Sequence, residues 1–99
     1  MNVAVDGHGV FVHTGGEPFD AARPAVVLVH GAGMDHSVWR YQSRRLAASG
    51  WAVVAPDLPG HGRSGGDLLA SIAAMGAWVG RLTDVLGVVR PVIVGHSLG

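Results

Sequence analysis

The stretch VIVGHSLG, residues 92–99, decides the fold of this chain. Its first three residues are apolar and β-branched, which is typical of a strand buried in a parallel sheet. The next five, Gly95-His96-Ser97-Leu98-Gly99, place one hydroxyl between two glycines. A sharp turn from strand to helix would hold Ser97 in a strained conformation and leave no room for side chains two residues away on either side. The pattern therefore predicts a serine whose hydroxyl is presented at the end of a strand.

Two further apolar runs, residues 25–29 and 51–55, predict buried strands of the same kind. Between them, residues 36–49 predict a helix that stops at Gly50. Its predicted apolar face consists of Trp39, Leu46 and Ala47. Strand, helix and strand in this order indicate a parallel α/β sheet, in which ligands bind at the carboxyl ends of the strands.

A second helix is predicted before the last strand, with Asp67 as its N-cap and Gly87 at its end. Its apolar residues keep helical spacing: Leu69, Ile72, Met75, Val79, Leu82 and Leu86. Near the N-terminus, alternating valines flank a Gly-containing turn and predict an antiparallel hairpin over about residues 2–13. We therefore expect one α/β domain over residues 1–99, a hairpin followed by a parallel β-α-β-α-β portion over about residues 25–99.

The composition limits the classes of partner. The chain has seven Arg, no Lys and seven acidic residues, so its formal net charge is zero and no basic stripe predicts binding to nucleic acid or to an anionic membrane. No secretion signal or membrane span is recognisable, and cysteine is absent. These features favour a cytoplasmic protein with a small-molecule substrate; they do not define its oligomeric state.

Three loops leave the carboxyl ends of the predicted parallel strands. They carry His30-Gly31-Ala32-Gly33, Asp57-Leu58-Pro59-Gly60-His61-Gly62-Arg63-Ser64 and Gly95-His96-Ser97-Leu98-Gly99. Together, and in this order, these motifs resemble the N-terminal part of a serine α/β-hydrolase of the esterase, lipase and lactonase type. The resemblance covers roughly residues 25–99.

By this resemblance, Ser97 is the nucleophile, and the backbone N–H groups of Ala32 and Leu98 form the oxyanion hole. Gly95 and Gly99 are the glycines of the nucleophile elbow. His30 and the loop 57–64 are expected to hold the shape of the site without taking part in the chemistry. The resemblance implies no metal and no organic cofactor.

Two other patterns in the sequence are typical of different binding sites. Gly60-x-Gly62-x-x-Gly65 matches a dinucleotide-binding fingerprint, but Pro56 to Pro59 precede it as a longer excursion than that fingerprint allows, so we interpret the match as chance. The histidines His30, His36 and His61 show no metal-binding spacing, and no carboxylate accompanies them at a useful spacing. His96 is expected to point away from the serine and to pack against neighbouring strands.

In hydrolases of this type the general base His and the acid follow the serine in the chain. The resemblance therefore implies a fragment that ends at the elbow, is inactive alone, and leaves its last strand with an uncovered edge. The predicted function of the full-length parent is hydrolysis of a carboxylic ester or related acyl compound. The alternative is a non-catalytic ligand-binding module on the same fold. An aspartate nucleophile, as in epoxide hydrolases of this fold, is excluded by Ser97 itself.

Overall fold

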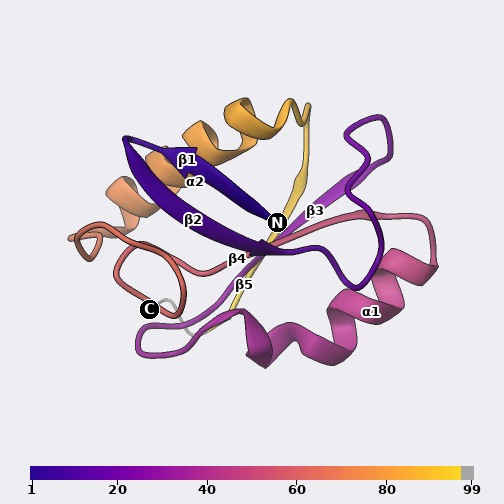
Figure 1. The fold of residues 1–99 in the computed structure, drawn as a ribbon, viewed down its shortest axis with the longest axis horizontal. Helices are drawn as coiled ribbons and strands as arrows, with labels where there is room; N and C mark the ends of the chain where they lie inside the picture. The colour runs from indigo at the N-terminus through magenta and orange to yellow at the C-terminus, as the bar shows by residue number, and fades with distance from the viewer. Residues whose placement is uncertain (97–99) are drawn as a thin grey trace.

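A computed structural model describes residues 1–96 of the chain as one five-stranded sheet with a helix on either side (Figure 1). The strand order is β1-β2-β4-β3-β5. β3 lies parallel to both β4 and β5, and β2 joins the sheet antiparallel to β4. The elements are β1 Asn2–Val5, β2 His8–His13, β3 Ala25–Val29, the 3₁₀ helix η1 His36–Trp39, α1 Arg40–Ala48, β4 Ala52–Pro56, α2 Ile72–Leu86 and β5 Val92–Gly95.

The two central strands are buried on both faces, and their side chains alternate between the helices. Val27 and Val54 belong to the core that includes Trp78 and Leu82 of α2. Val26, Leu28, Val53 and Ala55 form a second core with α1, against which Trp39 and Leu46 pack. The predicted α/β architecture and the apolar face of the first helix are confirmed.

The hairpin β1–β2 is confirmed as well. Val5 pairs with His8, so the connection is the two-residue turn of Asp6 and Gly7. Both residues have positive φ, 54° and 78°, as a turn matched to the twist of the strands requires. Across the pair, the Met1 ammonium donates to the Val12 carbonyl, and the Val12 N–H donates to the Met1 carbonyl.

The first helix differs from its prediction at both ends. Residues 36–39 form a 3₁₀ turn, because the Asp35 carboxylate accepts the N–H of Ser37 and caps this segment. The α-helix begins at Arg40 and ends at Ala48, before Gly50, whose φ of 96° reverses the chain toward β4. Strand β4 itself is shifted by one residue from the prediction, from 51–55 to 52–56.

The second helix ends where predicted but begins later. Gly87 is its C-cap with a left-handed φ of 71°. The predicted N-cap, Asp67, is wrong: Ser71 caps the helix through a hydrogen bond from the Ala74 N–H to its hydroxyl, 3.0 Å long. Leu69 therefore precedes the helix, and Ile72 lies exposed in its first turn instead of in the core.

Strand β5 is parallel to β3, as predicted, but its four residues are exposed. Its apolar pattern predicts burial in a complete sheet, whereas the sequence ending at Gly99 is expected to leave this strand with an uncovered edge. The observed exposure agrees with the second expectation. The reason is position: β5 is the last strand in the sheet order, whereas β4 lies between β2 and β3. Across residues 1–96, no helix has the length and apolar character needed to cross a bilayer.

Candidate active site

The expected site lies where the chain leaves the carboxyl ends of β3, β4 and β5. Gly95 is the last residue of β5, and the N–H of His96 donates to the Val29 carbonyl at 3.0 Å, which continues the parallel pairing by one residue. The position before Ser97 is thereby held beside the end of β3, from which the loop with Ala32 departs. Ser97, Leu98 and Gly99 themselves lie outside the described residues.

The ring of His96 packs edge-on against Trp39, with 5.9 Å between the ring centroids. This agrees with the expected packing role, although the partner is in η1 and not in a strand.

Ala32 lies exposed in the loop after β3. The N–H of Ala32 and the carbonyl of Gly31 belong to the same peptide group. Hydrogen bonds to this carbonyl fix the orientation of the group. This oxygen accepts the Met34 N–H at 3.1 Å and lies 2.8 Å from Nδ1 of His30. Within residues 1–96, the N–H of Ala32 has no hydrogen-bond acceptor. An oxyanion hole requires an N–H group that is fixed in direction and has no other acceptor.

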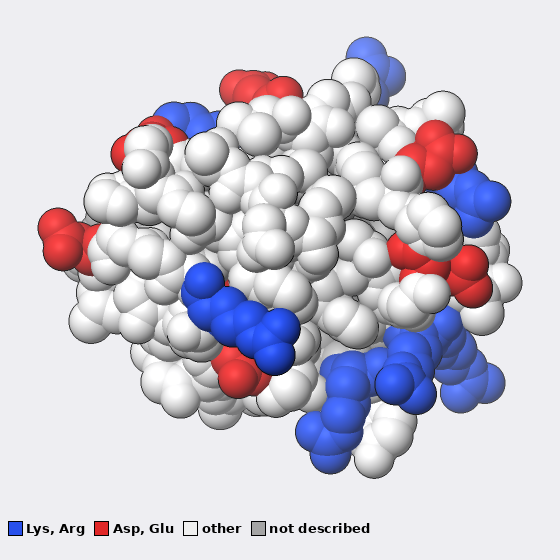
Figure 2. All heavy atoms as spheres, viewed as in Figure 1, with Lys and Arg blue, Asp and Glu red and all other residues white. Residues whose placement is uncertain are grey.

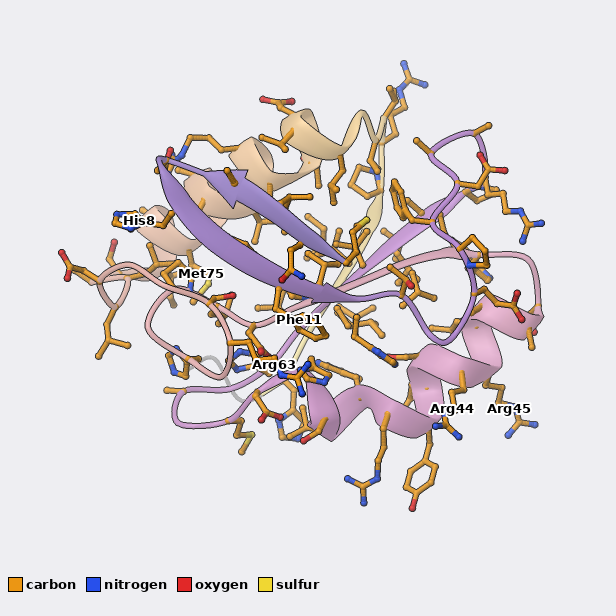
Figure 3. The ribbon with its side chains drawn as sticks, in the orientation of Figure 1. His8, Phe11, Arg44, Arg45, Arg63 and Met75 are labelled. Atoms are coloured by element: carbon orange, nitrogen blue, oxygen red, sulfur yellow. The ribbon has the colours of Figure 1, made fainter. Side chains whose placement is uncertain are left out.

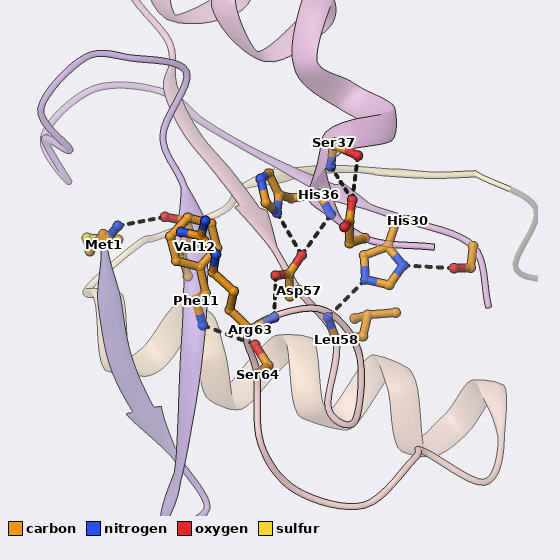
Figure 4. A network of polar contacts seen from close by, with 12 residues as sticks. Met1, Phe11, Val12, His30, His36, Ser37, Asp57, Leu58, Arg63 and Ser64 are labelled. Atoms are coloured by element: carbon orange, nitrogen blue, oxygen red, sulfur yellow. Dashed lines mark hydrogen bonds and ion pairs between the residues drawn. The ribbon is translucent and has the colours of Figure 1, made fainter. Parts of the chain in front are cut away.

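His30 is fully buried and connects the loops after β3 and β4 (Figure 4). The N–H of Leu58 donates to its Nε2 at 3.0 Å, so Nδ1 carries the proton and donates to Gly31. Burial lowers the pKa of His30 most, and His61 adds to this; the hydrogen bond to Gly31 opposes it. The ring is therefore held neutral, in the structural role predicted for it.

Asp57, the first residue after β4, is a second link between the loops and is fully buried. Its Oδ1 accepts both the backbone N–H and Nδ1–H of His36, each at 2.8 Å, and its Oδ2 accepts the Arg63 N–H at 2.9 Å (Figure 4). Burial alone would raise the pKa of this carboxyl, but the hydrogen bonds from Arg63 and His36 outweigh it and hold the pKa below its usual range. The Asp57 carboxylate also fills the space beside Gly62, where a Cβ would collide with it.

The contact between His36 and Asp57 corrects the expectation that no carboxylate accompanies the histidines. Asp35, His36 and Asp57 bring one possible metal ligand each within 4.8 Å of one another. Both oxygens of Asp57 already accept N–H donors, so the arrangement is explained by hydrogen bonding. His36 is further packed by the rings of Phe11 and His13, at centroid distances of 4.9 and 5.4 Å.

Strand β2 is tied to the same loops. The N–H of Phe11 donates to the buried hydroxyl of Ser64 at 3.0 Å, and the guanidinium of Arg63 lies 5.0 Å from the Phe11 ring centroid (Figure 3). The loop 57–64 is therefore fastened on both sides, to β2 and to the loop after β3. This supports its expected role in holding the shape of the site.

The glycine pattern 60–65 does not open a helix. Helix α2 begins only at Ile72, seven residues after Gly65. A dinucleotide fingerprint requires the helix to start directly at its glycines. The interpretation as a chance match is confirmed.

A hollow of about 520 Å³ lies between the two loops and the start of α2. Ala32, Gly33 and His61 form part of its wall. The rest includes the apolar side chains of Met34, Leu58, Leu68, Leu69 and Met75. Apolar walls with a few polar groups are typical of small-molecule sites.

The surface charges gather away from this hollow. Arginine side chains form a group over α1, at the lower right of Figure 2. Its members on that helix are Arg40, Arg44 and Arg45, all exposed. Elsewhere in Figure 2 groups of both signs are scattered singly or lie next to each other. Two such neighbours form ion pairs, Arg81 with Asp6 and Arg23 with Asp20. The sequence predicts no basic stripe, and the arginines of this group named above all belong to one helix.

Two contacts in this region were not foreseen from the sequence: His36 with Asp57, and His61 with Gly33, where the Gly33 N–H donates to Nε2 of the ring at 3.1 Å. Their partners are 21 and 28 residues apart. The available signal was that each pair lies in two loops predicted to leave neighbouring parallel strands at the same edge of the sheet.

A family model described as the alpha/beta hydrolase fold matches residues 24–99. The chain is 42% identical over 66 residues to the pimeloyl-[acyl-carrier protein] methyl ester esterase of Edwardsiella ictaluri, a match that covers 67% of this chain and 24% of the relative. It is 36% identical over 85 residues to epoxide hydrolase B of Mycobacterium tuberculosis, covering 83% of this chain and 24% of the relative.

Among solved structures, epoxide hydrolase A from Mycobacterium thermoresistibile superposes with a TM-score of 0.83 at 27% identity. The superposition covers 98% of this chain and 30% of that chain. The first curated relatives are also much longer than this chain, which spans 22%, 20% and 25% of three of them.

Proposed function

The chain belongs to the alpha/beta hydrolase family, and from that premise we propose that it forms the N-terminal portion of a serine hydrolase acting on a carboxylic ester or related acyl compound. The observation that carries this proposal is the N–H of Ala32. Ala32 is exposed, the peptide group that carries its N–H is fixed through Gly31, and the residue lies in the loop beside the segment that leads to Ser97. The length of the relatives supports a longer parent protein.

In this proposal the hydroxyl of Ser97 attacks the acyl carbonyl. The negative charge that develops on the carbonyl oxygen is stabilised by the N–H groups of Ala32 and Leu98, while Gly95 and Gly99 permit the tight elbow. A serine hydroxyl needs a positioned base. We place the general base histidine and its acid partner in the part of the parent protein that follows Gly99.

The relatives include both an esterase and epoxide hydrolases, and the nucleophile distinguishes these activities. A serine that opened an epoxide would form an ether, which water does not cleave at a useful rate. A serine that attacks an ester forms an acyl-enzyme, which water hydrolyses readily. Ser97, together with the N–H of Ala32 proposed for the oxyanion, therefore favours acyl chemistry.

The apolar hollow indicates what such a substrate carries. We propose that an apolar part of the ester, its acyl or alcohol group, lies against Met34, Leu58 and Met75 next to Ala32. The partner is then a small molecule, and the chemistry needs neither a metal nor an organic cofactor.

The test is covalent labelling of the full-length hydrolase with a fluorophosphonate probe, followed by peptide mapping. We expect one labelled residue, Ser97, and complete loss of labelling in the Ser97→Ala variant. Residues 1–99 alone are expected to remain unlabelled, because the base is absent. A folded full-length protein that binds small apolar esters without being labelled would instead support the non-catalytic binding module.

A further inference from the structure

The loops after β3 and β4 exchange hydrogen bonds through two histidines. His30, directly after β3, accepts the N–H of Leu58 from the other loop. His61, in the loop after β4, accepts the N–H of Gly33 from the first loop. The two rings lie 5.0 Å apart between centroids. The arrangement is reciprocal, with each loop supplying one imidazole and one backbone donor.

The hydrogen bonds of His61 fix its tautomer. Its Nδ1 lies 3.0 Å from the carbonyl oxygen of Pro59, which only accepts, so Nδ1 carries the proton. Its Nε2 receives the Gly33 N–H at 3.1 Å, so Nε2 is unprotonated. Both bonds exist together only in the neutral ring with the proton on Nδ1.

The two histidines act on the two peptide groups that flank the α-carbon of Ala32. His30 bonds to the Gly31 carbonyl, which belongs to the peptide group carrying the Ala32 N–H. His61 bonds to the Gly33 N–H, which belongs to the following peptide group. Fixing both groups fixes the backbone dihedrals of Ala32 and hence the direction of its N–H. The next residue, Gly33, has a φ of 78°. Because glycine has no Cβ, this position restricts the backbone of the loop less than another residue would.

We propose that His61 is a positioning residue for the N–H of Ala32, which it holds in the direction that stabilises the oxyanion. This inference rests on the proposed function. His61 acts through Gly33 and does not need to touch the substrate, although it lines the same hollow. Its contribution is to the transition state, since the oxyanion forms only during reaction.

The matched variants are His61→Gln and His61→Asn in the full-length hydrolase. A glutamine places its side-chain oxygen near the position of Nε2, so it can still accept the Gly33 N–H. An asparagine reaches only the position of Nδ1, so it keeps a donor for the Pro59 carbonyl and loses the acceptor for Gly33. Since a donor displaced by about 1 Å can cost 100-fold in rate, we expect His61→Asn to lower kcat between about 10- and 100-fold with KM within about twofold. His61→Gln should stay within about threefold of the parent.

Hydrolysis of a p-nitrophenyl ester measures kcat and KM, and amide hydrogen exchange at Gly33 reports its hydrogen bond directly. The exposed His8 of β2 supplies a control, His8→Gln, which should react like the parent. If His61→Asn does not fold, His61→Ala replaces it as the variant without an acceptor.

The outcomes separate the two proposals. An unlabelled Ser97 in the folded parent contradicts the proposed function, whatever Gly33 does. An active parent in which His61→Asn keeps its kcat, or in which His61→Gln is slowed as much as His61→Asn, overturns the positioning role. Protection of the Gly33 amide that is equal in the parent and in His61→Asn overturns it as well.

Discussion

Strands β4 and β5 consist of similar residues and have opposite surroundings. Ala52–Pro56 is buried throughout, whereas Val92–Gly95 is exposed throughout. β4 pairs with β2 and β3 and is covered by a helix on each face, while β5 pairs with β3 at the end of the sheet order. An apolar, β-branched run thus predicts a strand, but its burial depends on which elements lie next to it.

The segments that follow these two strands also differ in how many contacts hold them in place. The loop after β4 begins with a carboxylate that accepts three N–H groups, and the neighbouring His30 supplies a further link. The described part after β5 consists of His96, which bonds to Val29 and packs against Trp39. The β3–β4 side of the candidate site is therefore built by residues 1–96 alone, and its stability is open to direct test.

The largest effect is expected for Asp57→Ala. The substitution leaves the N–H groups of His36 and Arg63 without their acceptor inside the structure. Each buried group that loses its partner costs about 1–3 kcal/mol, so we expect a loss of about 3 kcal/mol or more in the free energy of unfolding. Urea denaturation of the 99-residue chain measures it. Asp84→Ala, at an exposed position of α2, is the control and should change stability by less than about 0.5 kcal/mol. Equal effects would contradict the role given to Asp57.

The second prediction compares one substitution in the two strands. Val54 is completely buried and Val92 is 50% exposed. Val54→Ala removes buried apolar surface and leaves a cavity, with an expected cost of about 2 kcal/mol. Val92→Ala should cost less than half as much in the 99-residue chain. The same pair measured in the full-length hydrolase sharpens the comparison, because a rise in the cost of Val92→Ala there would show that another part of the protein covers β5.

The third prediction concerns pH. Burial lowers the pKa of His30, whose neighbours are His61, Asp57 and Asp35, and burial and then His36 lower that of His13. Below the ordinary histidine pKa of about 6.5, the unfolded chain then binds more protons than the folded one, so stability falls as the pH drops. The slope is at most about 1.4 kcal/mol per pH unit for each proton. Asp57 adds a further loss as the pH falls from about 5 through 4, because the unfolded chain then takes up a proton near the ordinary carboxyl pKa of about 3.9 while the lowered pKa of Asp57 keeps the folded chain ionised.

Urea midpoints between pH 7.5 and 4.5 test this window. His30→Gln should reduce the slope between pH 6.5 and 5. An unchanged slope in that variant would show that His30 does not titrate between the two states.

Much of the fold could be predicted because it depends on local pattern. The strand over residues 25–29 was predicted with its observed bounds, and the hairpin and the end of α2 at Gly87 were predicted correctly. What could not be predicted depends on which segments meet in space. The bonds of His36 to Asp57 and of Gly33 to His61 join loops that only the folded sheet brings together. The roles of Ser97, Leu98 and Gly99 remain predictions from the motif and its resemblance.

The start of α2 was predicted wrongly, although the sequence near it contains the residue that caps the helix. The apolar spacing from Leu69 onward predicts Asp67 as the N-cap, whereas the structure uses Ser71, which is also a residue type that caps helices well. The segment before Ser71 instead packs Leu69 against the core formed by α2 and the sheet. The chain can start its helix only after Leu69 has reached that core, so the later cap is used.

The smallest predicted effect tests this choice of cap. Ser71→Ala removes the acceptor for the Ala74 N–H and should cost about 1 kcal/mol. Asp67→Ala, the matched change at the position that the sequence favoured, should cost less than about 0.5 kcal/mol, because its exposed side chain does not cap α2. Ser71→Asp should retain most of the stability, since a carboxylate can take the same bond and is favourable at a helix N-terminus. Because α2 borders the hollow through Met75, loosening its first turn should also raise KM for apolar esters in the full-length hydrolase, by less than about threefold, with kcat unchanged. A larger loss in Asp67→Ala than in Ser71→Ala would mean that the helix begins at the earlier position in solution.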